Sequence, residues 1–227
     1  MSDQPAQGYR SVLRAGLFED QVVLVTGGGS GIGRCITHEL ASLGAQVVIV
    51  GRTEDKLATV AAEVEADGGR CSYTACDIRE PEQVADAIGF VLDGHGRLDG
   101  LVNNAGGQFP SRLEDISPNG FAAVVRNNLT GTFIVMREAY NAWMGHHGGA
   151  IVNITADHRS GFPGMAHTGA ARAGVSNLTM TGAIEWGPSG VRVNEVAPGV
   201  IASTGLDTYG DAMKQVLRGF AAHLPVG

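Results

Sequence analysis

The stretch that decides the fold is Val22-Val23-Leu24-Val25-Thr26-Gly27-Gly28-Gly29-Ser30-Gly31-Ile32-Gly33, near the start of a chain of 227 residues. An apolar β-branched run leads directly into a glycine-rich turn, and a segment of helical period begins at Gly31. Glycines at such a turn let the backbone bend tightly and approach a pyrophosphate, whose charge the N–H groups at the helix start attract. The stretch therefore predicts a dinucleotide-binding turn, and a tight turn without a ligand remains the alternative.

The strand-then-helix pattern repeats along the chain. Further runs too apolar to be half-exposed, and therefore expected to be strands covered on both faces, lie at 45–50, 98–103, 150–154 and 191–196. Segments of helical period lie at 31–43, 54–66, 80–92, about 119–144, about 169–186 and 213–224. This alternation predicts an α/β fold, a single Rossmann-type doubly wound parallel sheet with helices on both faces.

Composition excludes several classes of protein. With 44% hydrophobic residues and a net charge of −7, the chain suits one globular domain, residues 19–227, preceded by an N-terminal arm, residues 1–18. The acidic balance and the presence of only two lysines, Lys56 and Lys214, argue against nucleic-acid binding. No apolar run approaches the roughly 20 residues of a membrane span, and no signal peptide is apparent. Three cysteines without a CxxC pair favour a reducing, cytoplasmic setting.

Five motifs in order point to a family. The TGxxxGxG spacing is followed by Asp77-Ile78, Asn103-Asn104-Ala105-Gly106, Asn128 and Pro198-Gly199. Through these motifs the chain, from about residue 17 to 200, resembles the short-chain dehydrogenase/reductase family. The resemblance implies cofactor contacts from Gly27, Ser30, Gly31, Ile32 and Gly33 at the phosphates, Asp77 and Ile78 at the adenine, Asn104, Ala105 and Gly106 at the inner ribose, and Pro198, Gly199, Ile201 and Ser203 at the nicotinamide. Asp77 as a turn cap, and Asn103 and Asn104 as ties between strands, remain alternatives.

The end of the second predicted strand bears on the choice of cofactor. NAD enzymes of this fold need an acidic residue there to accept the ribose 2′-hydroxyl. Here the strand ends in Gly51-Arg52, which leaves space and offers a planar cation that fits a phosphate. These residues predict NADP(H), with a surface arginine that holds no ligand as the alternative.

The residues expected to transfer protons depart from the family pattern. The resemblance implies a serine just after the strand at 150–154 and a YxxxK pair on the helix that follows it. In this chain those three slots hold Ala156 (or Thr155), Thr168 and Arg172. Neither Ala156 nor Thr168 can do acid–base work at neutral pH, which argues against an ordinary carbonyl reductase or alcohol dehydrogenase.

The departures match one branch of the family, the enoyl-CoA reductases, in the stretches 101–109, 128–133 and 169–175. This resemblance implies NADPH-dependent reduction of the C=C bond of an unsaturated acyl-CoA thioester or a similar activated alkene, with charge developing on the thioester oxygen. Arg172 is then expected to fix the cofactor ribose and supply positive potential, and Asn128 to hold an ordered water. The resemblance places a proton donor just after the strand at 150–154, and His158 is the nearest residue there that could serve. His167 is a second candidate.

Two other functions stay open: a carbonyl reductase or alcohol dehydrogenase with a relocated acid, and a catalytically silent NADP-binding scaffold or sensor. The resemblance implies a homodimer or homotetramer formed through the long helix and the next one. His146 and His147 lack spaced partners, so no metal site is expected. In the family a substrate loop, here from about residue 200, precedes a last strand, and we expect that strand to be missing.

Overall fold

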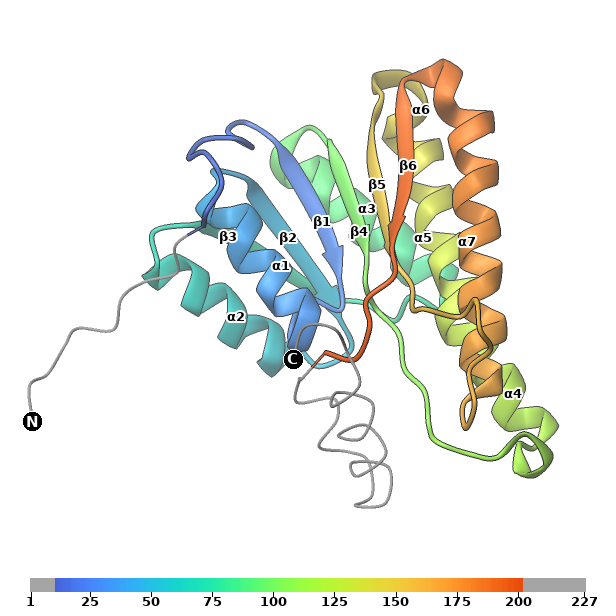
Figure 1. Cartoon of the computed structure of the whole chain (residues 1–227). Helices are drawn as coiled ribbons and strands as arrows, with labels where there is room; N and C mark the ends of the chain where they lie inside the picture. Colours follow the sequence, from blue (N-terminus) through green and yellow to red (C-terminus); the bar gives the residue numbers. More distant parts are fainter. Residues whose placement is uncertain (1–10, 202–227) are drawn as a thin grey trace, which may run out of the picture.

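A computed structural model describes residues 11–201 (Figure 1). Its strands are β1 (Val22–Thr26), β2 (Gln46–Gly51), β3 (Arg70–Ala75), β4 (Gly100–Asn103), β5 (Gly149–Ile154) and β6 (Val191–Val196). They pair in parallel in the order β3-β2-β1-β4-β5-β6, which confirms the predicted doubly wound sheet. The order reverses at β1 and β4, the point where sheets of this kind bind ligands. The segment on which the missing strand and the helix at 213–224 were predicted lies outside the described residues.

Helices cover both faces of the sheet (Figure 1). On one face lie α1 (Gly31–Ser42) and α2 (Glu54–Ala66), and on the other α3 (Pro81–His95), α4 (Pro118–Val125), α5 (Gly131–Ala139), α6 (Gly145–His147) and α7 (Ala166–Trp186). Two π-helical turns, η2 (Arg126–Thr130) and η3 (Tyr140–Met144), join α4, α5 and α6 into the single long helix that the sequence predicts. Short 3₁₀ turns, η1 (Leu113–Asp115) and η4 (Gly187–Ser189), complete the described elements.

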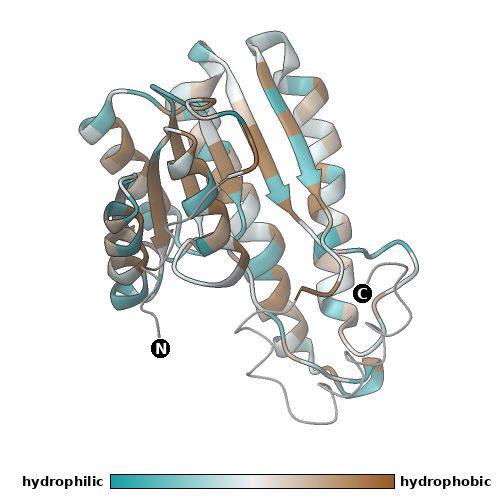
Figure 2. Ribbon diagram, turned by 60° about the vertical axis from the view of Figure 1, so that its left-hand side comes forward, coloured by the Kyte–Doolittle hydropathy of each residue, from teal (hydrophilic) through white to brown (hydrophobic). Residues whose placement is uncertain are grey.

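The period of two along each strand divides the core into two layers. Val22 and Leu24 of β1 pack in the layer beneath α3 and α5, whereas Val23 and Val25 pack in the layer beneath α1 and α2. Figure 2 shows the apolar strands between helices whose outward faces are more polar. Because both of their faces are covered, β1, β2 and β4 are continuous apolar runs, which explains why they could be predicted. The edge strand β3 mixes polar and apolar residues and was not among the predicted apolar runs.

The start of α7 differs from the prediction by one turn. The sequence favours a start at Gly169, but the helix begins at Ala166, after Met165. A Cβ at Gly169 would lie 2.6 Å from Cβ of Phe162, so this glycine allows a close approach inside the helix and does not mark its end. The earlier start places His167 and Thr168 in the first turn, where both are buried.

A buried polar ladder joins β4, β5 and α7. Asn103 Nδ2 donates to Asn153 Oδ1 at 2.9 Å, and Asn153 Nδ2 donates to Thr179 Oγ1 at 2.9 Å. All three side chains are buried in the layer between the sheet and α7. Asn103 therefore ties strands together, as the alternative interpretation held.

Asp77 caps the turn between β3 and α3. Its Oδ1 accepts a hydrogen bond from the backbone N–H of Arg79 at 3.0 Å and from Arg79 Nε at 2.8 Å. The hydrogen bond from the Arg79 side chain is the main reason why the pKa of Asp77 falls to about 2. The capping role is thus present, and the adenine contact of Asp77 stays a prediction.

The polar ladder predicts that removal of the Thr179 hydroxyl lowers the stability of the fold. Thr179→Val keeps the shape of the side chain but leaves Asn153 Nδ2 with only the Met136 sulfur, 3.4 Å away. We expect the free energy of unfolding in urea to fall by about 1–3 kcal/mol. Thr181→Val, at an exposed position of α7, is the matched control and should change it by less than about 0.5 kcal/mol. Equal effects of the two variants would contradict the ladder's contribution.

The cap predicts a pH-dependent stability. Because the pKa of Asp77 in the folded protein is lowered to about 2, its contribution is complete above the ordinary pKa of an unfolded aspartate, about 3.9, and is lost as the pH falls toward 2. Asp77→Asn should therefore destabilise the protein by about 1–2 kcal/mol at neutral pH, and the difference from wild type should shrink below about pH 4. Thermal melts between neutral pH and pH 3 measure it, with exposed Asp86→Asn as control. A difference that is independent of pH would refute the assignment.

Candidate active site

The glycine turn after β1 fits a pyrophosphate. Gly27 and Gly31 have φ of +68° and +53°, a conformation that side chains with a Cβ rarely adopt. A Cβ at Gly33 would lie 2.2 Å from the carbonyl oxygen of Gly27, so the turn and α1 pack without room for a side chain. Ser30, the N-cap of α1, makes no side-chain capping hydrogen bond, which leaves the helix N-terminus available to an anion.

An open groove of about 1020 Å³ lies beside this turn. It is lined by Ser30, Gly31 and Ile32, by side chains of α1 and α2 that include Lys56, and by Pro198 and Ile201 from the segment after β6. The structure therefore brings two of the residues predicted at the nicotinamide end next to the predicted phosphate contacts. Ser203 lies outside the described residues.

Asn104 joins the loop after β4 to the glycine turn. Its Nδ2 donates to the carbonyl oxygens of Thr26, at 3.0 Å, and Gly27, at 3.2 Å. In return, Thr26 Oγ1 accepts hydrogen bonds from the backbone N–H groups of Asn104 and Ala105, each at 3.0 Å. Thr26 was missed as a site residue, although its position in front of the glycines is the signal that could have identified it.

Arg172, Gly106 and Asn128 converge at the end of β5. Arg172 is 7% exposed and donates from Nη1 to the carbonyl oxygen of Ile154 at 2.9 Å. A Cβ at Gly106 would lie 2.4 Å from Arg172 Nη2 and 2.6 Å from Asn128 Oδ1, so this glycine makes room for both. Asn128, buried in η2, donates to the carbonyl oxygen of Gly107 at 2.7 Å and accepts from its N–H at 3.2 Å.

No acidic side chain in the described part of the chain neutralises the charge of Arg172. No ion pair among residues 11–201 includes it. Burial lowers the pKa of Arg172 to about 10, so the guanidinium still carries its charge at neutral pH. Since charge acts strongly where water is excluded, this cation gives the site a positive potential.

His167, one of the two candidate proton donors, is fully buried. Its Nδ1 accepts a hydrogen bond from the backbone N–H of Thr168 at 2.8 Å, and the hydroxyl of Thr168 lies 3.3 Å from the same nitrogen. The ring packs edge-on against Phe109, with centroids 4.5 Å apart, and Nε2 has no partner among the described residues. Burial lowers the pKa of His167, which favours its neutral form.

His158, the other candidate, is half-buried in the loop after β5. Its Nε2 lies 2.8 Å from Ser176 Oγ on α7, and that hydroxyl donates to Glu195 Oε2 on β6 at 2.6 Å. Neither Ser176 nor Glu195 was predicted as a site residue. A signal for Glu195 exists, because it follows Val191 and Val193 on the buried side of β6, where strand alternation predicts an apolar residue.

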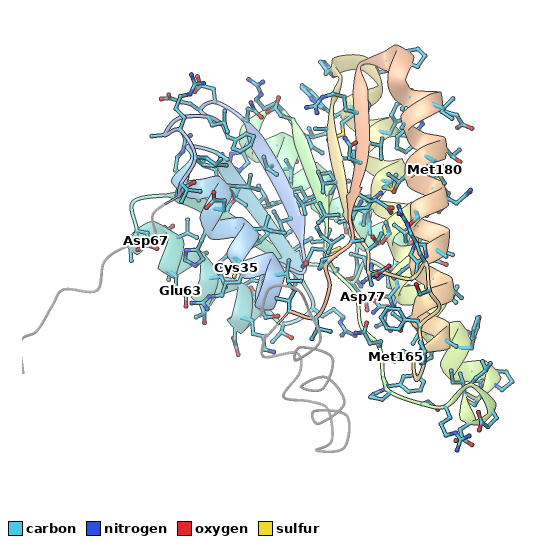
Figure 3. All side chains as sticks on the ribbon, viewed as in Figure 1. Cys35, Glu63, Asp67, Asp77, Met165 and Met180 are labelled. Atoms are coloured by element: carbon cyan, nitrogen blue, oxygen red, sulfur yellow. The ribbon has the colours of Figure 1, made fainter. Side chains whose placement is uncertain are left out.

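Arg52 is exposed directly after β2, as the sequence predicts. Its charge also contributes, less than Arg79 does, to the low pKa of Asp77, which shows that the two residues lie near each other. Figure 3 labels Asp77 and Met165, which both lie toward the edge of the sheet where the strands end. Arg52 forms no ion pair within the described part of the chain.

Two further observations, on metal ligands and on membrane-spanning helices, concern residues 11–201. No group of three or more histidine, cysteine, aspartate or glutamate side chains is placed to hold a metal ion. None of the described helices has the length and apolar character needed to cross a membrane. Cys35, Cys71 and Cys76 are all unpaired.

Comparison with known proteins extends these observations. The family profile described as short chain dehydrogenase matches residues 21–214. The chain is 40% identical over 207 residues to the peroxisomal 2,4-dienoyl-CoA reductase of Danio rerio, covering 89% of this chain and 68% of the relative. It is 37% identical to a probable 2,4-dienoyl-CoA reductase of Bacillus subtilis, covering 83% of this chain and 75% of the relative.

Among solved structures, a citronellol catabolism dehydrogenase (AtuB) of Pseudomonas aeruginosa PAO1 superimposes with a TM-score of 0.83. It is 53% identical in sequence, and the match covers 92% of this chain and 84% of that one. The predicted family is therefore confirmed by fold, by glycine turn and by relatives. This chain belongs to the short-chain dehydrogenase family of oxidoreductases.

Proposed function

We propose that the protein is an NADPH-dependent reductase of the carbon–carbon double bond in unsaturated acyl-CoA thioesters. The observation that carries this proposal is the buried Arg172 beside Gly106 and Asn128, which has no ion-pair partner among residues 11–201. The hydroxyl that occupies the family's tyrosine slot, on Thr168, is buried and lies against His167, so it offers no proton relay. The names of two relatives, 2,4-dienoyl-CoA reductases, support the same substrate class.

The site's own residues suit this chemistry. NADPH, when bound, supplies a hydride to the β carbon. Negative charge then develops on the thioester oxygen, and the fixed positive charge of Arg172 stabilises it without reorganisation. Asn128 holds the backbone of Gly107 on both sides and thereby fixes the loop that Gly106 belongs to. A proton for the α carbon must come from another group.

Of the two candidate acids, His158 fits and His167 does not. A general acid must hold a transferable proton near neutral pH and regain it from solvent. His167 is fully buried, its pKa is lowered, and its Nδ1 already accepts the Thr168 N–H, which opposes protonation there. His158 is partly accessible and contacts a hydroxyl linked to a carboxylate. We therefore assign the proton donor to His158.

A second candidate function rests on the 53% identity to a citronellol catabolism dehydrogenase. Oxidation of such an alcohol would need a base at the hydroxyl oxygen, and His158 in its neutral form would supply one. The same cation, Arg172, would then stabilise the alkoxide. This candidate differs from the first in substrate and direction and uses the same residues.

NADP(H) as the cofactor is supported by Gly51 and Arg52. Glycine leaves the end of β2 without the carboxylate that would repel a phosphate, and Arg52 is exposed there. Lys56, in the first turn of α2, packs against the glycine turn, since a Cβ at Gly29 would lie 3.1 Å from Cβ of Lys56. We infer that Arg52, together with Lys56, would hold the 2′-phosphate.

The proposed reaction predicts a substrate profile. Purified protein should oxidise NADPH with trans-2-enoyl-CoA and 2,4-dienoyl-CoA substrates, and only weakly with simple ketones. A parallel assay of NADP⁺ reduction with citronellol tests the second candidate. NADPH binding by calorimetry without turnover in any arm would overturn both and leave a silent binder.

If Arg52 contacts the 2′-phosphate, its replacement should weaken the binding of NADPH but not that of NADH. Arg52→Gln removes a charge-assisted contact worth about 1.5–3 kcal/mol, so the KM for NADPH should rise about 10- to 100-fold while that for NADH stays the same. Arg192→Gln, an exposed arginine near the amino end of β6, is the matched control. Equal effects on the two cofactors, or a wild-type preference for NADH, would contradict the assignment.

A further inference from the structure

Three polar side chains from three different elements form a hydrogen-bonded chain: His158, Ser176 and Glu195. Ser176 Oγ on α7 lies 2.8 Å from His158 Nε2, 2.6 Å from Glu195 Oε2 and 3.2 Å from the carbonyl oxygen of Arg172. All three side chains are half-buried between the loop after β5, α7 and β6. The serine is thus the link between the histidine and the carboxylate.

The direction of each hydrogen bond follows from the atoms present. A serine hydroxyl has one proton, and both the Glu195 carboxylate and the Arg172 carbonyl can only accept. The carboxylate is nearer and charged, so it takes that proton. His158 Nε2 must then donate to Ser176 Oγ, and neutral His158 is the Nε2–H tautomer. Its Nδ1 is the nitrogen that gains and loses a proton.

Glu195 stands where β6 should carry an apolar residue. Val191 and Val193, four and two positions earlier on the same face, are buried in the core. A carboxylate in such a row is costly unless it is hydrogen-bonded, and among the described residues Glu195 belongs to no ion pair. Its position is therefore explained by its bond to Ser176 and not by packing.

The other charged groups nearby do not replace this link. Asp157 and Arg159, on either side of His158, are exposed. The Arg172 guanidinium is directed to Ile154 and Gly106, and only its backbone carbonyl approaches Ser176. The arrangement also differs from a serine hydrolase triad, in which the acid contacts the histidine.

We propose that Ser176 and Glu195 are positioning residues that keep a proton on Nε2 of His158, so that the second proton of the imidazolium, on Nδ1, is the one delivered to the substrate. This proposal rests on the proposed function. As hydride adds to the β carbon, the π electron pair of the C=C bond moves toward the α carbon and the thioester oxygen. The α carbon then forms a C–H bond with the Nδ1 proton of the imidazolium, the N–H electron pair remains on Nδ1, and the ring is left as the neutral Nε2–H tautomer. Solvent restores that proton while Nε2–H stays bound to Ser176.

The tautomer can be measured without turnover. NMR of protein labelled at the histidine ring nitrogens, recorded where the ring is neutral, should show Nε2–H for His158 in the wild type, with assignment from His158→Phe. Ser176→Ala and Glu195→Gln should each give a mixture of tautomers. Asn177→Ala and Asp157→Asn, exposed positions next to Ser176 and His158, are the matched controls and should give the wild-type pattern.

Kinetics test the consequence for the reaction. Ser176→Ala and Glu195→Gln should lower kcat with an enoyl-CoA substrate by about 10- to 100-fold and leave KM unchanged, because only the orientation of the acid is lost. Ser176→Thr keeps the hydroxyl and should restore most of kcat. His158→Phe should abolish turnover while NADPH binding persists.

Each outcome separates the two proposals. A wild-type Nδ1–H tautomer, or an unchanged spectrum in Ser176→Ala, overturns the positioning role whatever the activity. Loss of turnover in His158→Phe with full kcat in Ser176→Ala also overturns it but leaves His158 as the acid. Full turnover in His158→Phe removes this histidine from the reaction. If no substrate is reduced, the proposed function fails, and the spectra alone decide whether the link holds the tautomer.

Discussion

The hydrogen bonds between Thr26 and Asn104 are the constraint on which the rest of the site depends. They join the ends of β1 and β4, the two strands at which the sheet order reverses. Because Asn104 also binds the carbonyl oxygen of Gly27, the glycine turn and the loop after β4 are held as one surface. This tie fixes the position of the loop that contains Gly106, and of Arg172 beside it, relative to the glycine turn.

Arg172 packs close to this surface because Gly106 has no side chain. Gly106 leaves the space that the guanidinium and Asn128 fill, and Asn128 in turn holds the next residue, Gly107, by both backbone groups. An arginine in the family's lysine slot is wider than a lysine, and its Nη1 is anchored on the end of β5 at Ile154. The site therefore presents a rigid cation, which suits charge stabilisation better than proton transfer.

Much of this could be predicted from the sequence, and the exceptions have physical causes. The buried strands and the glycine turn were recognised because their signals are local. The start of α7 was wrong by one turn because Gly169 is required by packing against Phe162, which lies in a loop. The sequence favoured His158 and kept His167 as a second candidate, because burial and hydrogen bonding, which distinguish them, depend on the fold. Glu195 could have been identified from the sequence, because it stands where the alternation along β6 predicts an apolar residue.

The two proposed reactions, alkene reduction and alcohol oxidation, would use the same residues and would differ in the protonation of His158 Nδ1. Reduction needs a proton on His158 Nδ1 before the α carbon can accept it, whereas oxidation needs that nitrogen free to take the hydroxyl proton. Arg172 stays charged in both cases, so it sets no direction. If the Ser176–Glu195 link holds Nε2–H, the ring need not turn between the two proposed reactions.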